Sequence, residues 1–239
     1  MSFRRSLVAW LMRKEVGVTE KEWRRMSYSF AQDAEDLVLD RILQRSSPGF
    51  YVDVGAYHPV IISNTWHFYQ IRKWWGICIE PNPEMAKVLR QRRPRDIVVE
   101  TAIGTRSGTA QYEMFGESNY NRLANDAPPP DYLRRLLPGK KTVTVPMATL
   151  AEVLAAHLPL STPVDLLTVD CEGHDFEVLR SNDWARYLPR AICVESHDPQ
   201  EEKEIISYLK ERKYYLSAKI NHSLIFGFEK RPAVILRKG

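Results

Sequence analysis

Short apolar runs alternate with longer amphipathic stretches along most of the chain. Runs of four or five apolar positions bounded by turn residues are typical of buried strands, and apolar residues at helical spacing indicate helices between them. Strands are predicted at residues 50–54, 76–79, 97–100, 165–169 and 191–194, with two more at 214–218 and 224–228. Helices are predicted at residues 32–45, 83–92, 150–157, 176–180 and 201–212. This alternation predicts an α/β fold, with an open, mostly parallel sheet that carries helices on both faces.

Three segments depart from this rhythm. Residues 1–26 are basic and amphipathic, which predicts a helical appendage that either packs on its own domain or contacts a membrane surface or a partner. Residues 109–115 alternate like an exposed edge strand. Residues 116–140 are rich in proline and asparagine and predict an irregular insertion that serves as a substrate lid. The chain is therefore divided into an appendage, 1–26, and one domain, 27–239.

Composition is that of an ordinary globular protein, with 44% hydrophobic and 27% charged residues in a chain of 239. The net charge of +4 is too weak by itself to indicate nucleic-acid binding. The basic runs at residues 90–95 and 134–141 are interpreted as solvated surface, so no nucleic-acid partner is expected. The longest stretch without a charged side chain, 54–71, contains polar residues and cannot cross a bilayer as a helix.

Cysteine usage and the N-terminal segment bear on location. Cys78, Cys171 and Cys193 are widely separated and have no zinc-site spacing, which favours a reducing cytoplasm. No secretory signal is recognised in the first residues. The expected location is the cytoplasm, with peripheral membrane contact through residues 1–26 and homo-oligomer formation left open.

Carboxylates recur where the predicted parallel strands end. Four strands end in, or next to, an acidic residue: Asp53, Glu80, Asp170 and Glu195. In open α/β sheets, ligands bind beyond the carboxyl ends of the strands. A single glycine, Gly55, follows the first strand, and Glu80 at the end of the second can accept hydrogen bonds from both hydroxyls of a ribose or can cap the next helix. The incomplete glycine motif favours S-adenosylmethionine over a dinucleotide, and a nicotinamide-dependent oxidoreductase is the less favoured alternative.

The motifs around these strands resemble the FkbM family of S-adenosylmethionine-dependent methyltransferases. The resemblance is carried by residues 28–36, 51–59, 63–65, 76–83, 102–104 and 170–179. It implies a Rossmann-like class I methyltransferase sheet, mostly parallel with an antiparallel C-terminal hairpin. It also implies O-methylation of a sugar, a glycan or a glycosylated natural product. A metal-independent methyltransferase acting on another small molecule or on nucleic acid is the alternative.

The resemblance also implies where the cofactor lies. Asp53 and Gly55 are expected beside its methionine part, Glu80 on the ribose, and Ala102 and Ile103 near the adenine. The cofactor's carboxylate is expected to meet three consecutive residues, Ser63, Asn64 and Thr65, on the helix that follows the first loop. A helix carrying Gln32, Glu35 and Asp36 on one face is expected to cover the pocket.

Methyl transfer to a hydroxyl requires an oriented oxygen and a group that removes its proton. The ends of the fourth and fifth strands offer six suitable side chains: Asp170, Glu172, His174, Glu195, His197 and Asp198. Asp170, Glu195 and Asp198 are predicted to hold Mg²⁺ or another divalent cation, which binds oxygen ligands. His174 or His197, with Asp170, is predicted to remove the proton, and His58 is a third candidate base.

The metal-free alternative for these residues stays open. In that interpretation, Asp170 and Glu172 orient the cofactor and the acceptor, and a histidine alone acts as the base.

Overall fold

The computed structural model describes residues 17, 19, 27–44, 48–115, 120–124 and 140–228. Most of the predicted appendage, 1–26, lies outside these residues, as does most of the predicted lid, 116–140. Only residues 120–124 and 140 of that lid are described.

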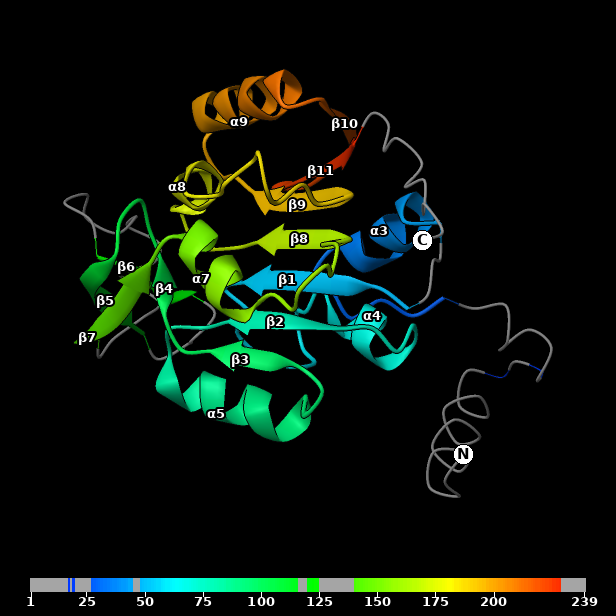
Figure 1. The fold of residues 1–239 in the computed structure, drawn as a ribbon. Helices are drawn as coiled ribbons and strands as arrows, with labels where there is room; N and C mark the ends of the chain where they lie inside the picture. The colour runs from blue at the N-terminus through cyan, green and yellow to red at the C-terminus, as the bar shows by residue number, and fades with distance from the viewer. Residues whose placement is uncertain are drawn as a thin grey trace, which may run out of the picture.

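A seven-stranded sheet forms the centre of the protein (Figure 1), in the order β10-β11-β9-β8-β1-β2-β3. Five strands are parallel: β1 (Phe50–Val54), β2 (Trp75–Ile79), β3 (Ile97–Val99), β8 (Leu166–Val169) and β9 (Ala191–Glu195). The last two, β10 (Tyr214–Ile220) and β11 (Ser223–Phe228), form an antiparallel hairpin that pairs with β9. The predicted fold class is confirmed.

The strand register explains why acidic residues meet at one edge. Val54 of β1 pairs with Ile79 of β2 on one side and with Val169 of β8 on the other. Val169 in turn pairs with Val194 of β9. The carboxyl ends of four parallel strands are therefore level, and the residue after each end lies at the same edge of the sheet.

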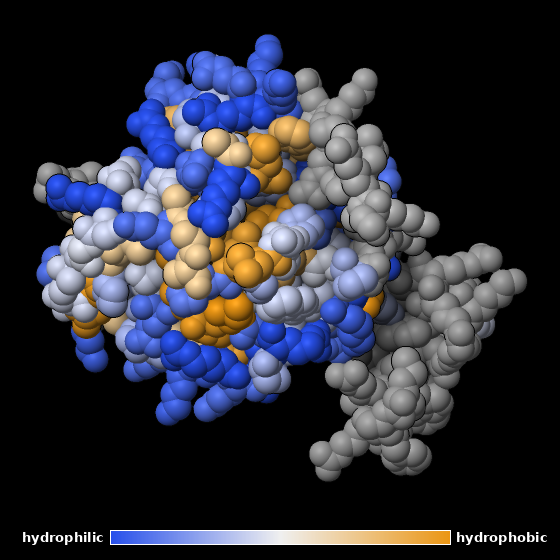
Figure 2. All heavy atoms as spheres, viewed as in Figure 1, coloured by the Kyte–Doolittle hydropathy of each residue, from blue (hydrophilic) through white to orange (hydrophobic). Residues whose placement is uncertain are grey.

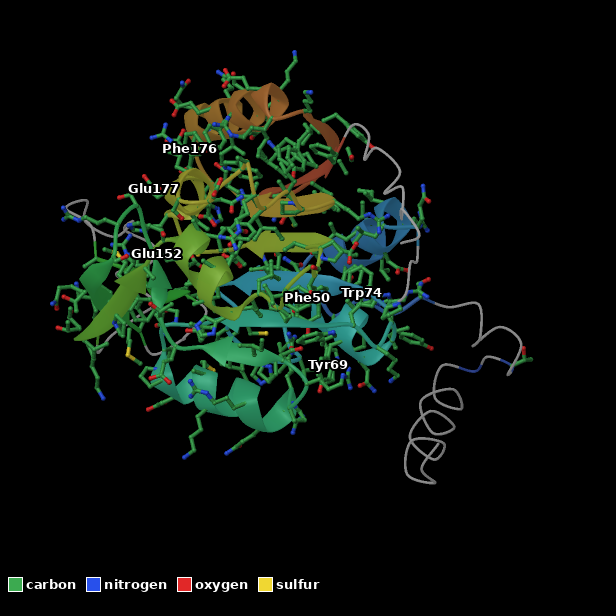
Figure 3. The ribbon with its side chains drawn as sticks, viewed as in Figure 1. Phe50, Tyr69, Trp74, Glu152, Phe176 and Glu177 are labelled. Carbon is green, nitrogen blue, oxygen red and sulfur yellow. The ribbon has the colours of Figure 1, made fainter. Side chains whose placement is uncertain are left out.

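Helices cover both faces of this sheet. The bounds are α3 (Glu35–Ile42), α4 (Trp66–Gln70), α5 (Pro83–Arg92), α7 (Leu150–His157), α8 (Asp175–Arg180) and α9 (Pro199–Glu211). Apolar side chains of α7, α8 and α9 pack in one core with Phe50 and Phe176, whereas those of α3, α4 and α5 pack in a second with Tyr69 and Trp74 (Figure 3). Each face of the sheet therefore has its own core.

Local signals set several helix ends. Asn82 accepts a hydrogen bond from the Glu84 amide and Pro83 occupies the first turn, so α5 has its predicted bounds. Helix α3 was predicted to begin at residue 32 but begins at Glu35. The reason is that Ala34 adopts a left-handed conformation with φ of 68°. Helix α4 follows the loop after β1, where the resemblance implies a helix that carries Ser63, Asn64 and Thr65, but it begins only at Trp66.

A second, four-stranded sheet is inserted between β3 and β8, in the order β4-β7-β5-β6. Its strands are β4 (Ala102–Ile103), β5 (Gly108–Met114), β6 (Arg122–Leu123) and β7 (Lys141–Ala148). It lies beyond the carboxyl ends of β1 and β8 (Figure 1). The predicted strand at 109–115 is confirmed as β5, but its predicted edge position is wrong, because β5 pairs with both β6 and β7. Its alternation reflects a half-exposed sheet face and not an unpaired edge.

The distribution of hydrophilic side chains on the surface reflects the outward faces of the amphipathic helices. Hydrophilic side chains dominate over α9 and α5, with apolar side chains between them (Figure 2). Leu160, in the loop after α7, is 95% exposed. Within the described ranges, no helix has the length and apolar character needed to cross a membrane.

Candidate active site

A cavity opens at the carboxyl ends of the parallel strands, and it holds about 1060 Å³ when its open mouth is included. One wall comes from the loops after β1, β2, β8 and β9, and the other from the second sheet. Nine residues that the sequence singled out as site candidates line it: Gln32, Gly55, Glu80, Ala102, Ile103, Asp170, Glu172, Glu195 and His197. The structure therefore brings together most of the predicted site.

Gly55 joins the loops after β1 and β8. Its φ of 77° lies in the left-handed region, and a Cβ atom at this position would lie 1.8 Å from the backbone oxygen of Asp170. Only glycine fits both constraints. The residue therefore has a structural role that is independent of any bound ligand.

Glu80 is buried where β2 ends, with both carboxylate oxygens facing backbone amides. The amide of Tyr57 donates to Oε2 and that of Asn82 to Oε1, each at 2.8 Å. Burial raises the pKa of Glu80 to about 7, although these two hydrogen bonds oppose the shift. A carboxylate has about four acceptor positions, so two remain for a ligand. Since Asn82 caps α5, the alternative role of Glu80 as a helix cap is wrong.

Ala102 and Ile103 form β4 and line the cavity on the side of the second sheet. Both are buried, as is Thr101 before them. Their position between the two sheets gives the cavity an apolar wall. A flat ring such as adenine would suit this wall, and the predicted role stays a prediction.

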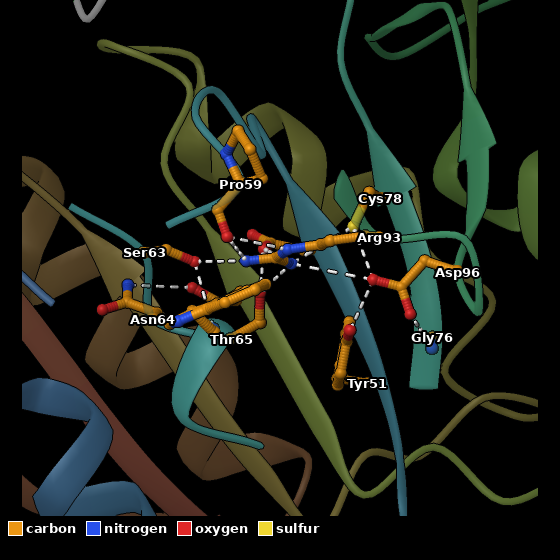
Figure 4. A network of polar contacts seen from close by, with 12 residues as sticks. Tyr51, Pro59, Ser63, Asn64, Thr65, Gly76, Cys78, Arg93 and Asp96 are labelled. Atoms are coloured by element: carbon orange, nitrogen blue, oxygen red, sulfur yellow. Dashed lines mark hydrogen bonds and ion pairs between the residues drawn. The ribbon is translucent and has the colours of Figure 1, made fainter. Parts of the chain in front are cut away.

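Ser63 and Thr65 lie elsewhere, in a buried cluster around Arg93 (Figure 4). Asp53 belongs to the same cluster. Arg93 donates to the hydroxyls of Thr65 at 2.7 Å and of Ser63 at 2.6 Å. Thr65 donates to Asp53, whose carboxylate lies 3.7 Å from Arg93. These three residues were predicted to contact the cofactor, but the structure does not place them on the cavity wall. Their polar groups are used within the fold because Arg93 faces them.

Arg93 itself was misinterpreted from the sequence. The run at residues 90–95 was expected on a solvated surface, yet the Arg93 side chain is 0% exposed. Nε and Nη2 of Arg93 both donate to the carbonyl oxygen of Pro59, at 2.9 and 2.7 Å. The signal was its spacing: Ala86, Leu89 and Arg93 follow one helical stripe, and all three are buried.

Asn64 and Gln32 lie in segments outside the main sheet, and both line a small bay next to the large cavity. The Asn64 amide donates to the hydroxyl of Thr168 at 3.1 Å, and it lines a small bay that adjoins Asp170 and Glu195. Gln32 lies ahead of α3 and lines both this bay and the large cavity. Both predicted residues are therefore close to the carboxylates.

The predicted common face of Gln32, Glu35 and Asp36 is formed only in part, because Glu35 lines the same small bay as Gln32 but Asp36 does not. The carboxylate of Glu35 accepts hydrogen bonds from Ser223 Oγ at 3.0 Å and from the Asp33 amide. Asp36 accepts from Ser29 Oγ at 2.7 Å and from the Phe30 amide. These two acids hold the segment before α3 in place.

Asp170 and Glu195 meet at the ends of β8 and β9. Burial and the charge of Glu195 raise the pKa of Asp170 well above its usual range, so its carboxyl donates a hydrogen bond to Glu195. Burial alone would raise the pKa of Glu195, but the hydrogen bonds from His197 and Asp170 lower it. The second oxygen of Asp170, Oδ1, is buried and has no hydrogen-bond partner. The pair holds one proton between two carboxyl groups.

The turn after β8 adds a third carboxylate to the cavity wall. Glu172 has a φ of 50°, unusual for a residue with a side chain. Asp175 stabilises this turn by accepting hydrogen bonds from the amides of Cys171 at 2.8 Å and Gly173 at 3.1 Å. Burial and the nearby Glu195 raise the pKa of Glu172 to about 7.

Of the three candidate bases, only His197 lines the cavity. Its Nε2 lies 3.4 Å from Oε2 of Glu195, and this contact raises the pKa of His197. His174 precedes α8 and does not line the cavity, and burial lowers its pKa. His58 uses Nδ1 to accept hydrogen bonds from the amides of Val60 and Ile61, so it stabilises its own loop.

The predicted three-carboxylate metal site is not formed. Asp198 is exposed and caps α9, where it accepts a hydrogen bond from the Gln200 amide at 2.6 Å. Its carboxylate is therefore not directed to Asp170 and Glu195. Among the residues that the structure describes, no group of three or more His, Cys, Asp or Glu side chains is arranged to hold a metal ion.

The second sheet contributes lining residues that sequence reasoning missed: Tyr112, Arg122 and Leu123. Arg122 donates from Nε to Glu113 at 3.1 Å, and its charge lowers the pKa of the nearby Glu172. Tyr120, Arg122 and Leu123 fall within the predicted lid. Their position on the wall is compatible with that prediction, while the movement of the segment stays a prediction.

Comparison with known proteins adds a family match. The sequence model of a family described as "Methyltransferase FkbM domain" matches residues 53–216. No curated protein matches the chain. Among solved structures, one described as "METTL16 MTase domain (crystal form 2)" is similar at 10% sequence identity. Its TM-score is 0.47 over 97% of this chain and 83% of that chain, a level too low to carry an argument.

Proposed function

The chain belongs to the family of FkbM methyltransferases, and from that premise we propose that it methylates a hydroxyl group with S-adenosylmethionine as donor. The acceptor we propose is a sugar, a glycan or a glycosylated natural product. The observation that carries the proposal is the row formed by Asp170, Glu195 and His197 on one wall of the cavity.

The cavity suits the proposed donor. Glu80 has two acceptor positions left for ribose hydroxyls, and Ala102 and Ile103 supply an apolar wall. The buried, unpartnered oxygen of Asp170 can accept a hydrogen bond from a ligand's ammonium group. When bound, S-adenosylmethionine supplies a methyl group on a positively charged sulfur.

The acceptor hydroxyl is activated by His197 in this proposal. As the oxygen forms its bond to the methyl carbon, the carbon–sulfur bond breaks and the hydroxyl proton passes to Nδ1 of His197. Nε2 of the same ring faces Glu195, whose carboxylate stabilises the imidazolium that forms. Asp170 orients Glu195 by donating a hydrogen bond to it.

The pH dependence follows from this role. The base must be neutral, and Glu195 raises the pKa of His197 above its usual 6.5. The rate should therefore rise with pH through a midpoint above 6.5. Replacing Glu195 by Gln should move that midpoint to lower pH, because the neutral amide no longer stabilises the imidazolium.

The test uses radiolabelled S-adenosylmethionine and a panel of glycosides, with cofactor affinity measured by calorimetry. His197→Ala should lower kcat by about 10²- to 10⁴-fold while leaving cofactor affinity unchanged. His157→Ala, at an exposed histidine on α7, is the matched control and should change neither quantity. Label appearing only on amines or nucleic acid would overturn O-methylation, and a loss confined to His174→Ala would move the base to His174.

A chelator arm separates the metal-dependent alternative. We expect full turnover in excess chelator, because the proposed base needs no metal. Loss of turnover that Mg²⁺ restores would instead establish a divalent ion at Asp170 and Glu195.

A further inference from the structure

Two neighbouring isoleucines are exposed where the cavity opens. Ile61 is 61% exposed and Ile62 is 41% exposed, and Ile62 also lines the cavity. Neither belongs to a buried core of the protein. A single exposed apolar residue needs no explanation, but an adjacent pair, one of which lines a cavity, points to a ligand.

The backbone holds Ile62 in an unfavourable conformation. Its φ of 56° lies in the left-handed region, which branched side chains rarely adopt. Tyr57, in the same loop, also lines the cavity and has a φ of 44°. Such conformations persist only where the surroundings impose them, and they gather at ligand sites.

Contacts behind the loop impose this conformation. Arg93 donates two hydrogen bonds to the carbonyl oxygen of Pro59, and the amide of Ser63 donates to the carbonyl oxygen of Phe30 at 2.9 Å. His58 accepts hydrogen bonds from the amides of Val60 and Ile61. The loop is thus anchored on both sides of the isoleucines, and their exposure is built into the fold.

The rest of the cavity wall near these isoleucines is polar. Ile62 and Glu195 both line the large cavity and the adjoining small bay, so they lie in the same part of the site. Glu172 and His197 also line the large cavity. An acceptor held here meets hydrogen-bonding groups on one side and aliphatic carbon on another.

We propose that Ile61 and Ile62 bind an apolar portion of the acceptor, next to the hydroxyl that is methylated. The acceptor is then an amphiphilic molecule, with an alkyl or aryl substituent beside its hydroxyl, and not a wholly polar oligosaccharide. This inference rests on the proposed function, since it names the class of acceptor for the same site.

The test compares two probes that differ only in their apolar group, octyl and methyl β-D-glucopyranoside, each below the micellar concentration of the octyl compound. Binding is measured by NMR or calorimetry on full-length protein saturated with S-adenosylhomocysteine. We expect the octyl glucoside to bind at least 10-fold more tightly. Ile61→Thr and Ile62→Thr should each remove most of this preference.

Two controls locate the effect. Ile71→Thr and Leu160→Thr change isoleucine and leucine side chains that are exposed but do not line the cavity, and they should keep the preference. Ile62→Asn tests whether the residue is merely structural, because asparagine tolerates a left-handed backbone. That variant should unfold at the same temperature or higher, yet lose the octyl preference.

The two proposals fail in distinguishable ways. If the protein binds S-adenosylhomocysteine but binds both glucosides equally, or neither, the apolar acceptor site is overturned while the methyltransferase proposal stands. If Leu160→Thr and not Ile62→Thr removes the preference, the octyl chain binds elsewhere and the inference is also overturned. Failure of the wild-type protein to bind S-adenosylhomocysteine would overturn the proposed function instead.

Discussion

Around Arg93, one buried cation faces two carboxylates, Asp53 and Asp96, each 3.7 Å away. Around Asp170, by contrast, carboxylates face one another, and the pKa values of Asp170 and Glu172 are raised by burial and by Glu195. Both regions lie on the same sheet, and both remove charged groups from water. In the first, Arg93 lowers the pKa of both carboxylates against the effect of burial. In the second, His197 and Arg122 offset the negative charge only in part.

This difference distinguishes charged residues that stabilise the fold from charged residues that are available to a ligand. The Arg93 cluster is internally paired, so it needs no ligand and serves to fix the loop between β1 and α4. The Asp170 cluster has an excess of acceptors and an unpartnered carboxylate oxygen, which a positively charged ligand can satisfy.

The largest effect on stability is expected when Arg93, the cation that faces two buried carboxylates, is removed. Arg93→Leu should lower the free energy of unfolding by about 3–5 kcal/mol, because it leaves buried carboxylates without their cation. Denaturant unfolding monitored by circular dichroism measures this change.

The matched control for Arg93 is Arg90→Leu on the same helix. Arg90 pairs with Glu100 at 2.9 Å, but both side chains are at least one-third exposed. Its replacement should cost less than about 1 kcal/mol. Equal costs for the two variants would show that the Arg93 cluster is not a compensated structural unit.

A smaller effect is expected at Glu80, which belongs to the cavity. Glu80→Ala should weaken S-adenosylmethionine binding by about 1.5–3 kcal/mol, the range for hydrogen bonds to a charged group. Calorimetry would report this as a roughly 10- to 150-fold rise in Kd. Glu84→Ala, an exposed acid on the next helix, should leave Kd unchanged. A folded Glu80→Ala variant with unaltered affinity would remove Glu80 from the cofactor site.

The smallest effect should have the opposite sign to that of Arg93→Leu. Glu172→Gln removes one of the repelling carboxylates, so it should raise the free energy of unfolding at pH 8 by about 1 kcal/mol. The pKa of Glu172 is raised to about 7 from 4.5, so the folded protein binds its proton more tightly than the unfolded chain. The penalty for its charge is therefore absent below about pH 4.5 and grows until about pH 7.

Unfolding of Glu172→Gln and the wild type is therefore compared at pH 4.5 and at pH 8. We expect the Glu172→Gln variant to be more stable than the wild type at pH 8 and equally stable at pH 4.5. A loss of stability at both values would place Glu172 among the compensated charges.

The sequence was sufficient to predict the residues that follow parallel strands. Gly55, Glu80, Asp170 and Glu195 were expected together because level strand ends meet at one edge, a property of the backbone alone. Side-chain direction could not be predicted in the same way. Asp53 was assigned to the cofactor, but it faces Arg93, which is distant in sequence.

The other wrong or missed predictions concern residues whose hydrogen-bond partners form only in the folded protein. Asp198 follows β9 as closely as the predicted site requires, yet the start of α9 takes its carboxylate as a cap. Strands β4 and β6 are two residues long, too short for a periodic pattern, and β5 finds its partners only through the folded second sheet. The wall that carries Arg122 was therefore missed.

The two ends of the second sheet lie side by side. Ala102 of β4 pairs with Met147 of β7, and Ile103 pairs with Ala148, so the chain leaves the main fold and returns to it at one place. Tyr112 and Arg122, on the cavity wall, lie in the segment between these two strands. Because both ends of this segment lie together, changes in its length and side chains can alter one wall of the pocket without displacing the loops that carry Gly55 and Glu80.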